Sequence, residues 1–233
     1  MIPQTACAKV TIIISRKRVI FLRLSGFRTR LRQDGKYLLW LPVYLLFFLF
    51  LEQRPMEHYW ATQIPLDDLI PFCEWFAIPY YLWYPLLVAV GLYLFFRDSP
   101  SFRRYMVFLA ITFFTSALIW FLIPNGQDLR PLTLPRDNVL TRLMLGIYAV
   151  DTHTNVFPSV HVVGSVGAAL AAWDCAGIRK HKWLAWSITV LAVLICLSVV
   201  FVKQHGVLDL LGGLVLCVPV GQWVYHRPNR TNG

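Results

Sequence analysis

The stretch WLAWSITVLAVLICLSVVFV-KQHG-VLDLLGGLVLCVPVGQWVY, residues 183–225, decides the fold of this chain. Its two apolar runs, Trp183–Val202 and Val207–Tyr225, each have about the 20 residues that a helix needs to cross the hydrocarbon core of a bilayer. The polar turn between them contains a histidine, His205. The stretch therefore predicts two membrane helices that meet at a polar, titratable turn.

The rest of the chain repeats this pattern. Four more candidate spans are Tyr37–Leu51, Phe72–Phe96, Tyr105–Ile123 and Phe157–Trp173. A hydrophobic content of 57% and a mean hydropathy of +0.56 exceed the usual values of soluble domains. Backbone polar groups must be satisfied internally in lipid, so helices are the expected elements. We predict an all-α fold, a polytopic integral-membrane helical bundle of about six transmembrane helices. The one long polar connection, 124–156, is expected to be a functional loop.

The distribution of Lys and Arg predicts the orientation of the bundle, which we place at residues 37–225. Most of the 22 basic residues lie in the N-terminal segment 1–36, the loops 97–104 and 174–182, and the tail 226–233. In a six-span bundle these segments share one side, which the positive-inside rule assigns to the cytoplasm. The basic N-terminal segment is then a topology signal or an interfacial arm on anionic lipid. Because the net charge of +10 belongs to loops, it does not predict nucleic-acid binding.

Two histidine motifs lie where apolar runs meet polar segments, and both fall on the exoplasmic side of this topology. They are Phe157–His161, which reads FPSVH, and Lys203–Asp209, which reads KQHGVLD. Ionisable residues at the edge of a lipid-embedded helix are costly and mark functional sites. His205 and Asp209 are four residues apart, so on the first turn of a helix they share one face. The carboxylate then keeps one imidazole nitrogen protonated and leaves the other as a nucleophile or base.

The residues around these motifs offer an anion-binding pocket. His161 begins a different helix and can supply the proton that a departing oxygen requires. Ser159 and Val160 lie at the start of that helix, where free amides and the helix dipole attract anions. Arg130, in the long polar connection, and Lys203 add positive charge. Two imidazoles, one orienting carboxylate and a cationic pocket suit phosphoryl transfer.

These residues resemble the motifs of the type 2 phosphatidic acid phosphatase family, which is related to the vanadium haloperoxidases. Pro158–His161 is similar to the family's Pro-Ser-Gly-His motif. Ser198–Asp209 is similar to its later motif, Ser-Arg, five residues, His, three residues, Asp. Arg130-Pro131 resembles the end of its first motif, Lys, six residues, Arg-Pro. The resemblance covers a phosphatase-like core at about residues 105–225. The Lys-Gln-His form of the later motif looks like the branch of inositol phosphorylceramide synthases and their bacterial relatives.

The resemblance implies a metal-independent lipid phosphatase that needs no cofactor. In the family the later histidine becomes a phosphohistidine, its aspartate orients it, and the earlier histidine protonates the leaving group. Carried onto this chain, the catalytic residues are His205, Asp209 and His161. The expected phosphate-binding residues are Arg130, Ser159, Val160 and Lys203. The expected partner is a lipid phosphate or diphosphate in the membrane, with head-group transfer to an acceptor alcohol as the alternative. The oligomeric state stays open.

Three positions depart from the family pattern. Ile123 replaces the first-motif lysine, Val199 the later arginine, and Val160 the usual glycine. An inactive lipid-binding relative is therefore an alternative, as is a proton-coupled transporter, in which intramembrane His and Asp form relays. A transporter predicts polar residues near span centres and paired repeats, whereas the polar residues here cluster at one face. The five cysteines show neither metal-ligand nor disulfide spacing and are expected to be packing residues.

Overall fold

The computed structural model describes residues 27–134 and 136–226. The chain divides into two compact units, Met1–Leu39 and Trp40–Gly233. Most of the predicted basic N-terminal segment, and the predicted tail beyond its first residue, lie outside the described residues. The described part of the first unit is helical at residues 27–34 and continues as the short helix η1, Gly35–Leu38.

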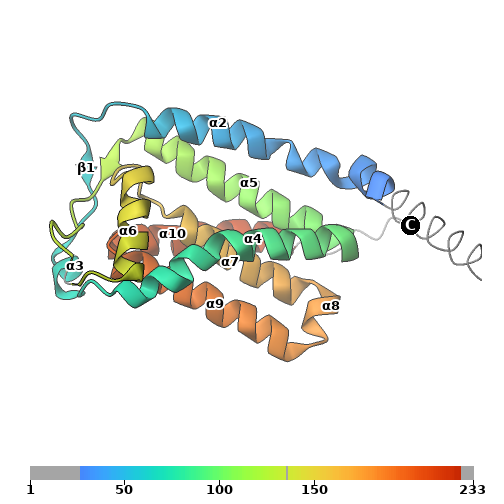
Figure 1. The fold of residues 1–233 in the computed structure, drawn as a ribbon. Coiled ribbons are helices and arrows are strands. Elements are labelled where there is room, and N and C mark those ends of the chain that lie inside the picture. Colours follow the sequence, from blue (N-terminus) through green and yellow to red (C-terminus); the bar gives the residue numbers. More distant parts are fainter. Residues whose placement is uncertain (1–26, 135, 227–233) are drawn as a thin grey trace, which may run out of the picture. The chain divides into compact units, whose positions relative to one another are not determined.

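The second unit is a bundle of helices with two very short strands (Figure 1). Its longer helices are α2 (Trp40–Glu52), α4 (Ala77–Arg97), α5 (Ser99–Leu122), α7 (Val160–Asp174), α9 (Lys182–Phe201) and α10 (Val207–Tyr225). Its shorter elements are β1 (Trp60–Ala61), α3 (Pro65–Leu69), η2 (Glu74–Phe76), β2 (Asn125–Gly126), α6 (Val139–Val150) and α8 (Ala176–Arg179). Figure 1 shows α3 and α6 at one end of this bundle and α8 at the other.

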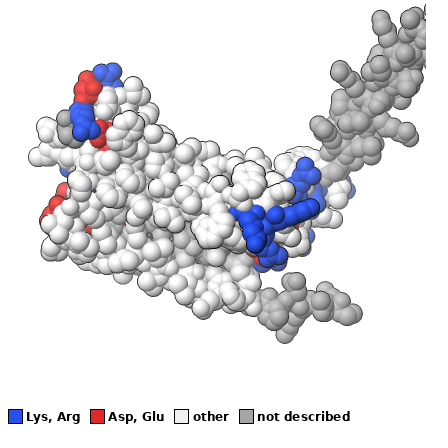
Figure 2. Space-filling model, turned by 90° about the horizontal axis from the view of Figure 1, so that it is seen from below, with Lys and Arg blue, Asp and Glu red and all other residues white. Residues whose placement is uncertain are grey.

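The predicted all-α membrane bundle is confirmed. Within the described residues, five helical segments are long and apolar enough to cross a membrane: Phe27–Glu52, Glu74–Arg97, Ser99–Leu122, Lys182–Phe201 and Val207–Tyr225. Outward-facing apolar side chains such as Leu92, Trp183 and Val215 are more than half exposed, and charged side chains are sparse over most of the face in Figure 2. Lipid covers such a surface, which soluble monomers rarely present. The remaining predicted span, Phe157–Trp173, corresponds to α7. This helix has 15 residues and is about 22 Å long.

Helix α7 lies at the centre of the bundle and packs against α4, α5, α9 and α10. Two glycines let its neighbours approach closely. A Cβ atom on Gly164 would lie 2.8 Å from Nε1 of Trp83, and one on Gly167 would lie 2.9 Å from the ring of Phe108. This packing of small residues against large ones holds the first turn of α7, and with it His161, between the neighbouring helices.

The connection 124–156 differs from the prediction of a continuous loop. It contains the strand β2, which pairs in parallel with β1, and the twelve-residue helix α6. The side chain of Asn138 begins α6 by accepting the N–H of Thr141, as N-cap residues do. The helix was missed because it is too short to span a membrane and carries only one charged side chain, Arg142, in an otherwise mostly apolar run.

Candidate active site

A cavity of about 250 Å³ lies between α2, α4, α5 and the start of α7. The imidazoles of His161 and His205 both line it. They are 4% and 5% exposed, and their ring centroids are 5.6 Å apart. The structure thus brings the two histidines of separate sequence motifs to one buried space.

The orientation of the His205 ring is set by two oxygen atoms. Its Nδ1 lies 3.0 Å from the backbone oxygen of Val156 and 3.7 Å from Oδ2 of the fully buried Asp209. Both oxygens are acceptors, so Nδ1 carries the hydrogen and Nε2 keeps a free lone pair. The prediction that His205 and Asp209 share the first turn of one helix is wrong, because α10 begins at Val207. The carboxylate of Asp209 accepts the N–H of Gly206 at 2.8 Å and reaches back toward His205.

The ring of His161 is held by aromatic contacts. Its centroid lies 4.6 Å from that of Tyr80 and 4.4 Å from that of Trp83. Neither of its nitrogens has a hydrogen-bond partner among the described residues. A buried imidazole without a partner is costly, so a ligand in the cavity is the natural partner for this ring.

The end of α9 turns His205 inward through an unusual backbone conformation. Lys203 has a φ of 57°, in the left-handed region that glycine usually occupies at a helix end. The amides of Gln204 and His205 both donate to the oxygen of Val199 at 3.0 Å. A non-glycine residue in this region costs about 1 kcal/mol or more and is often found at functional sites.

Lys203 is not part of the cavity lining. Its amine instead points to the short helix α3. Its Nζ donates to the backbone oxygen of Asp67 at 2.7 Å. Burial lowers the pKa of this amine, against the opposing effect of Asp67 and Asp68. The Asp67 carboxylate accepts the N–H of Val207 at 2.7 Å and so holds the start of α10. Lys203 therefore joins the histidine turn to α3.

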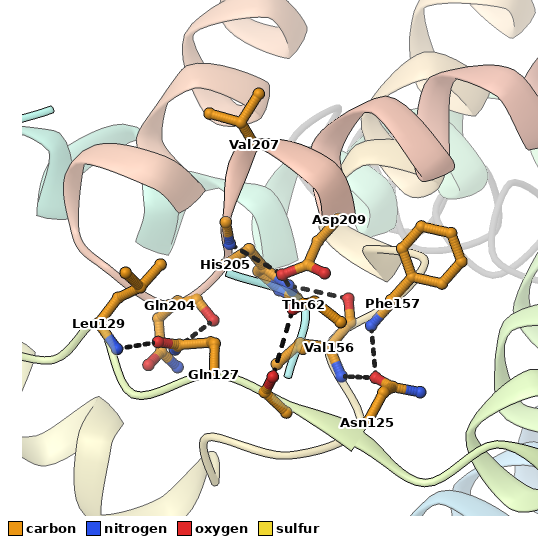
Figure 3. A network of polar contacts seen from close by, with 12 residues as sticks. Thr62, Asn125, Gln127, Leu129, Val156, Phe157, Gln204, His205, Val207 and Asp209 are labelled. Carbon is orange, nitrogen blue, oxygen red and sulfur yellow. Dashed lines mark hydrogen bonds and ion pairs between the residues drawn. The ribbon is translucent and has the colours of Figure 1, made fainter. Parts of the chain in front are cut away.

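Two side chains at β2, neither expected from the sequence, hold both histidine motifs (Figure 3). Asn125 is fully buried, and its Oδ1 accepts the amides of Val156 and Phe157 at 2.9 and 2.8 Å. Gln127 is also fully buried and donates through Nε2 to the backbone oxygens of Lys203 and Gln204. The segment Asn-Gly-Gln thus fixes the approach to His161 and the turn before His205. Its only sequence signal is its place between an apolar span and Arg130.

Ser159 and Val160, the expected phosphate-binding residues of the first histidine motif, lie at the start of α7, and Val160 but not Ser159 belongs to the cavity lining. Ser159 is fully buried, and its hydroxyl has no partner among the described residues. Its amide donates to the backbone oxygen of Asp209 at 3.2 Å, which ties this turn to the second motif. Val160 lines the cavity, and the amides of a first helical turn have no acceptor within the helix.

The guanidinium of Arg130 is hydrogen-bonded to backbone carbonyls and is not part of the cavity lining. It donates to the oxygens of Tyr148, Asp151 and Thr152 at 3.1, 2.6 and 2.7 Å. The guanidinium carbon, Cζ, lies 4.6 Å from the centroid of the Tyr148 ring, over its face. Burial lowers the pKa of Arg130, and the charge of Asp151 acts in the opposite direction. Arg130 therefore orders the end of α6 and the loop that leads to His161.

Both positions where the resemblance leads one to expect a cation carry an apolar residue in this chain. Val199 is fully buried in an apolar cluster that includes Tyr80 and Val162. Ile123 is the C-cap residue that follows α5 and is 51% exposed. The wall of the cavity instead includes a carboxylate, Asp151, that sequence reasoning did not single out.

Asp151 and Glu52 hold the loop before the first histidine motif. Oδ2 of Asp151 accepts from the hydroxyl of Tyr80 and from Nε2 of Gln204, both at 2.9 Å. Glu52 accepts from the hydroxyl of Thr152 at 2.7 Å and from Nδ2 of Asn155 at 2.9 Å. Asp151 and Asn155 lie shortly before the first histidine motif, which is their only sequence signal. Glu52 has no such signal.

Comparison with known protein families gives a match over much of the second half of the chain. The family model described as PAP2 superfamily matches residues 127–232, a little less than half of the chain. The match includes every predicted site residue and supports the type 2 phosphatase family. No curated protein and no solved structure matched the chain.

Proposed function

We propose that this chain is a multi-pass membrane enzyme that cleaves a lipid phosphate or diphosphate through a phosphohistidine on His205. One observation carries the proposal: two imidazoles from separate motifs face one buried cavity, and the Nδ1 side of His205 is engaged by acceptor oxygens. An imidazole held in this way presents its Nε2 lone pair to an electrophile. The match to the PAP2 superfamily supports phosphatase or phosphotransferase chemistry.

The reaction has two balanced steps. Nε2 of His205 forms a bond to phosphorus, while the bond from phosphorus to the lipid oxygen breaks and that oxygen takes a proton from His161. A water molecule or an acceptor alcohol then attacks the phosphohistidine and returns a proton to His161 as the nitrogen–phosphorus bond breaks. Water gives hydrolysis, and an alcohol gives head-group transfer.

The phosphate is held by the first turn of α7 in this proposal. The hydroxyl of Ser159 and the amide of Val160 lie at the positive end of the helix dipole, and the hydroxyl is buried without a partner in the described chain. Arg130 and Lys203, both bonded to backbone carbonyls, act by holding the two histidine loops. Negative charge on the non-bridging phosphoryl oxygens is then stabilised by preorganised dipoles.

Head-group transfer is a second candidate, favoured by the charges of the cavity. Within the described part of the chain, no Lys or Arg lines it, whereas the carboxylate of Asp151 does. A phosphate monoester brings up to two negative charges into this wall, and a phosphodiester brings one. The phosphodiester of a membrane phospholipid, the donor in head-group transfer, is therefore the better electrostatic match.

We place the site on the exoplasmic side and both termini in the cytoplasm. The basis is the concentration of Lys and Arg in alternate segments of the chain. Both histidine loops lie at the end of the bundle that holds α3 and α6, opposite α8 (Figure 1).

The test is purified full-length protein in detergent, assayed with a panel of lipid phosphates, diphosphates and phospholipids. Phosphate release, head-group exchange and covalent labelling by phosphorus-labelled substrate are measured for the wild type and for His205→Ala. We expect turnover and label in the wild type and neither in the variant. A wild type that turns over no lipid and takes no label, or a His205→Ala variant that is still labelled, would refute the proposal. Proton flux in proteoliposomes without turnover would favour the transporter.

A further inference from the structure

We propose that the polar end of the cavity is a subsite for the ammonium group of a zwitterionic phospholipid, with Asp151 as its counter-ion. The inference rests on the proposed function, because it names the head group attached to the phosphate that His205 attacks. It is carried by three features of the cavity: its charge, its aromatic wall, and the position of its carboxylate beside the histidine turn.

The charge of the cavity wall is negative. Apart from the two imidazoles, Asp151 is the only titratable acid or base with a formal charge at neutral pH among the described residues of the lining. Arg130 donates to the backbone oxygen of Asp151, and its charge interacts with that of Asp151, but no hydrogen bond or ion pair joins the guanidinium to the carboxylate among the contacts of the described residues. The carboxylate of Glu52, already bonded to Thr152 and Asn155, adds a second negative charge nearby. A carboxylate in a partly buried wall without a paired cation is unfavourable, and a cationic ligand removes that cost.

The position of the carboxylate suits a head group whose phosphate lies at His205. Oδ2 of Asp151 is fixed by Tyr80 and by Gln204, the residue before His205. Tyr80 also contacts the ring of His161, at 4.6 Å between centroids. The carboxylate is therefore linked to His161 through the side chain of Tyr80 and to the turn of His205 through the side chain of Gln204. In phosphocholine and phosphoethanolamine only two carbons separate the ammonium nitrogen from the phosphate oxygen.

Aromatic side chains make up much of the remaining wall. They are Tyr44, Phe48, Trp83, Tyr84, Phe113 and Trp120. Tyr44 and Tyr84 line the same cavity as Asp151. Aromatic rings beside a carboxylate are the surroundings that bind quaternary ammonium groups. An acyl chain would also fit against the rings, but it would leave the carboxylate with only the neutral hydrogen-bond donors Tyr80 and Gln204 and with no opposite charge.

The decisive comparison uses the wild type and two ligands of equal shape. Dihexanoyl phosphatidylcholine and its 3,3-dimethylbutyl ester analogue differ only by the replacement of the charged nitrogen with carbon. Their affinities for the full-length protein in detergent are measured by calorimetry. We expect the choline lipid to bind at least about tenfold more tightly, as one counter-ion and its aromatic contacts would give. Equal affinities would overturn the subsite, and this result does not depend on whether any variant folds.

A charge-removing variant assigns the effect to Asp151. Asp151→Asn should lower the affinity for the choline lipid by about tenfold and leave that for the dimethylbutyl analogue within about twofold. Asp128→Asn is the matched control, because that carboxylate is 71% exposed and is not part of the cavity lining. It should change neither affinity. If Asp151→Asn lowers the affinity for both ligands equally, the residue only supports packing, which would overturn the assignment.

Turnover separates this proposal from the function on which it rests. Diacylglycerol release is measured from phosphatidylcholine, phosphatidylethanolamine, phosphatidylglycerol and phosphatidate of equal chain length. Faster release from the two ammonium lipids supports both proposals, and their ratio tells which ammonium the subsite prefers. Binding of the choline lipid without turnover of any lipid would refute the phosphohistidine function and leave the subsite. Turnover of phosphatidate or phosphatidylglycerol at least as fast, with no preference in binding, would refute the subsite and leave the function.

Discussion

The backbone oxygen of Val156 lies 3.0 Å from Nδ1 of His205, closer than the carboxylate of Asp209 at 3.7 Å. A residue of β2 holds Val156 in place, because the side chain of Asn125 accepts the N–H of Val156. The ring of one motif is thus oriented by the backbone that leads into the other. Asp209, bonded to the N–H of Gly206, holds the start of α10 and gives the ring a second, longer-range acceptor.

Asn125 should control turnover more than binding. Asn125→Leu removes both acceptor bonds to residues 156 and 157 and frees the carbonyl that orients His205. We expect kcat to fall by one to two orders of magnitude, as misplacement of a catalytic group by about 1 Å does, with KM within about twofold. Steady-state kinetics measures the two constants.

The matched control for Asn125 is Thr62→Val, which removes a buried hydroxyl from the residue beside β1 and leaves Val156 untouched. It should retain near-normal kcat. Asn125→Asp, which keeps acceptor oxygens for both amides, should restore part of the turnover lost in Asn125→Leu. Equal effects of Thr62→Val and Asn125→Leu would mean that Asn125 only stabilises the fold.

His161 should matter only when the leaving group needs a proton. His161→Gln keeps a side chain of similar bulk between Tyr80 and Trp83 but removes the acid. We expect turnover of an alkyl phosphate to fall by about 10²–10⁴-fold, the usual contribution of general acid catalysis. p-Nitrophenyl phosphate, whose leaving group departs as an anion, should lose much less. Equal losses with both substrates, or a phosphohistidine trapped at position 161, would reverse the assigned roles.

Lys203 should contribute to stability through its bond to the Asp67 carbonyl. Lys203→Met keeps most of the aliphatic stem and removes the buried donor. The unfolding free energy should fall by about 1–3 kcal/mol, the usual cost of an unsatisfied buried partner, and KM should change little. Lys180→Met, at an exposed position beside α8, is the control and should leave the melting temperature unchanged. A rise of tenfold or more in KM with normal stability would instead place the amine on the phosphate.

The same variant tests the pKa of Lys203. Burial lowers this pKa in the folded protein, so the folded state releases the proton at a lower pH than the unfolded chain. The cost of the buried charge is present below the folded pKa and disappears as pH rises toward the ordinary value of about 10.4. The melting temperature of the wild type relative to Lys203→Met should therefore increase as the pH rises through that window. A constant or decreasing difference would contradict the lowered pKa.

Activity should persist in chelator and be inhibited by vanadate. The proposed nucleophile is an imidazole, and the groups proposed to stabilise the phosphoryl oxygens are the dipoles of the first turn of α7. Vanadate mimics the five-coordinate phosphorus and should compete with substrate. The measurement is the rate in excess EDTA and over a vanadate titration. Complete loss in EDTA with recovery on adding magnesium would contradict the metal-independent mechanism.

The orientation in the membrane can be tested with two reporters. One is fused after Gly233, and one is inserted at Leu132, which is fully exposed in the loop after β2. The charge distribution predicts a cytoplasmic position for the first and an exoplasmic position for the second. Accessibility to a membrane-impermeant reagent reads out both. Finding them on the same side would exclude this topology.

The apolar runs and the two histidine motifs were readable from the sequence because their signals are local. A run such as Trp183–Val202 forms a helix in lipid whatever its neighbours are, since no other arrangement satisfies its backbone. His205 and Asp209 are only four residues apart in the chain, so their side chains lie close together although the two residues do not share a helix turn. The short helix α6 was not recognised, because its 12 residues match neither a membrane span nor a strongly polar loop.

What the tertiary structure alone decided is which groups face the cavity. By charge, Arg130 and Lys203 were expected at the phosphate, yet both donate to backbone carbonyls of other segments. Asn125 and Asp151 had no motif to mark them, yet one positions His205 and the other lines the cavity. A polar side chain bonds to whichever unsatisfied partner the packing of distant helices brings within about 3 Å, and the order of residues along the chain does not contain that distance.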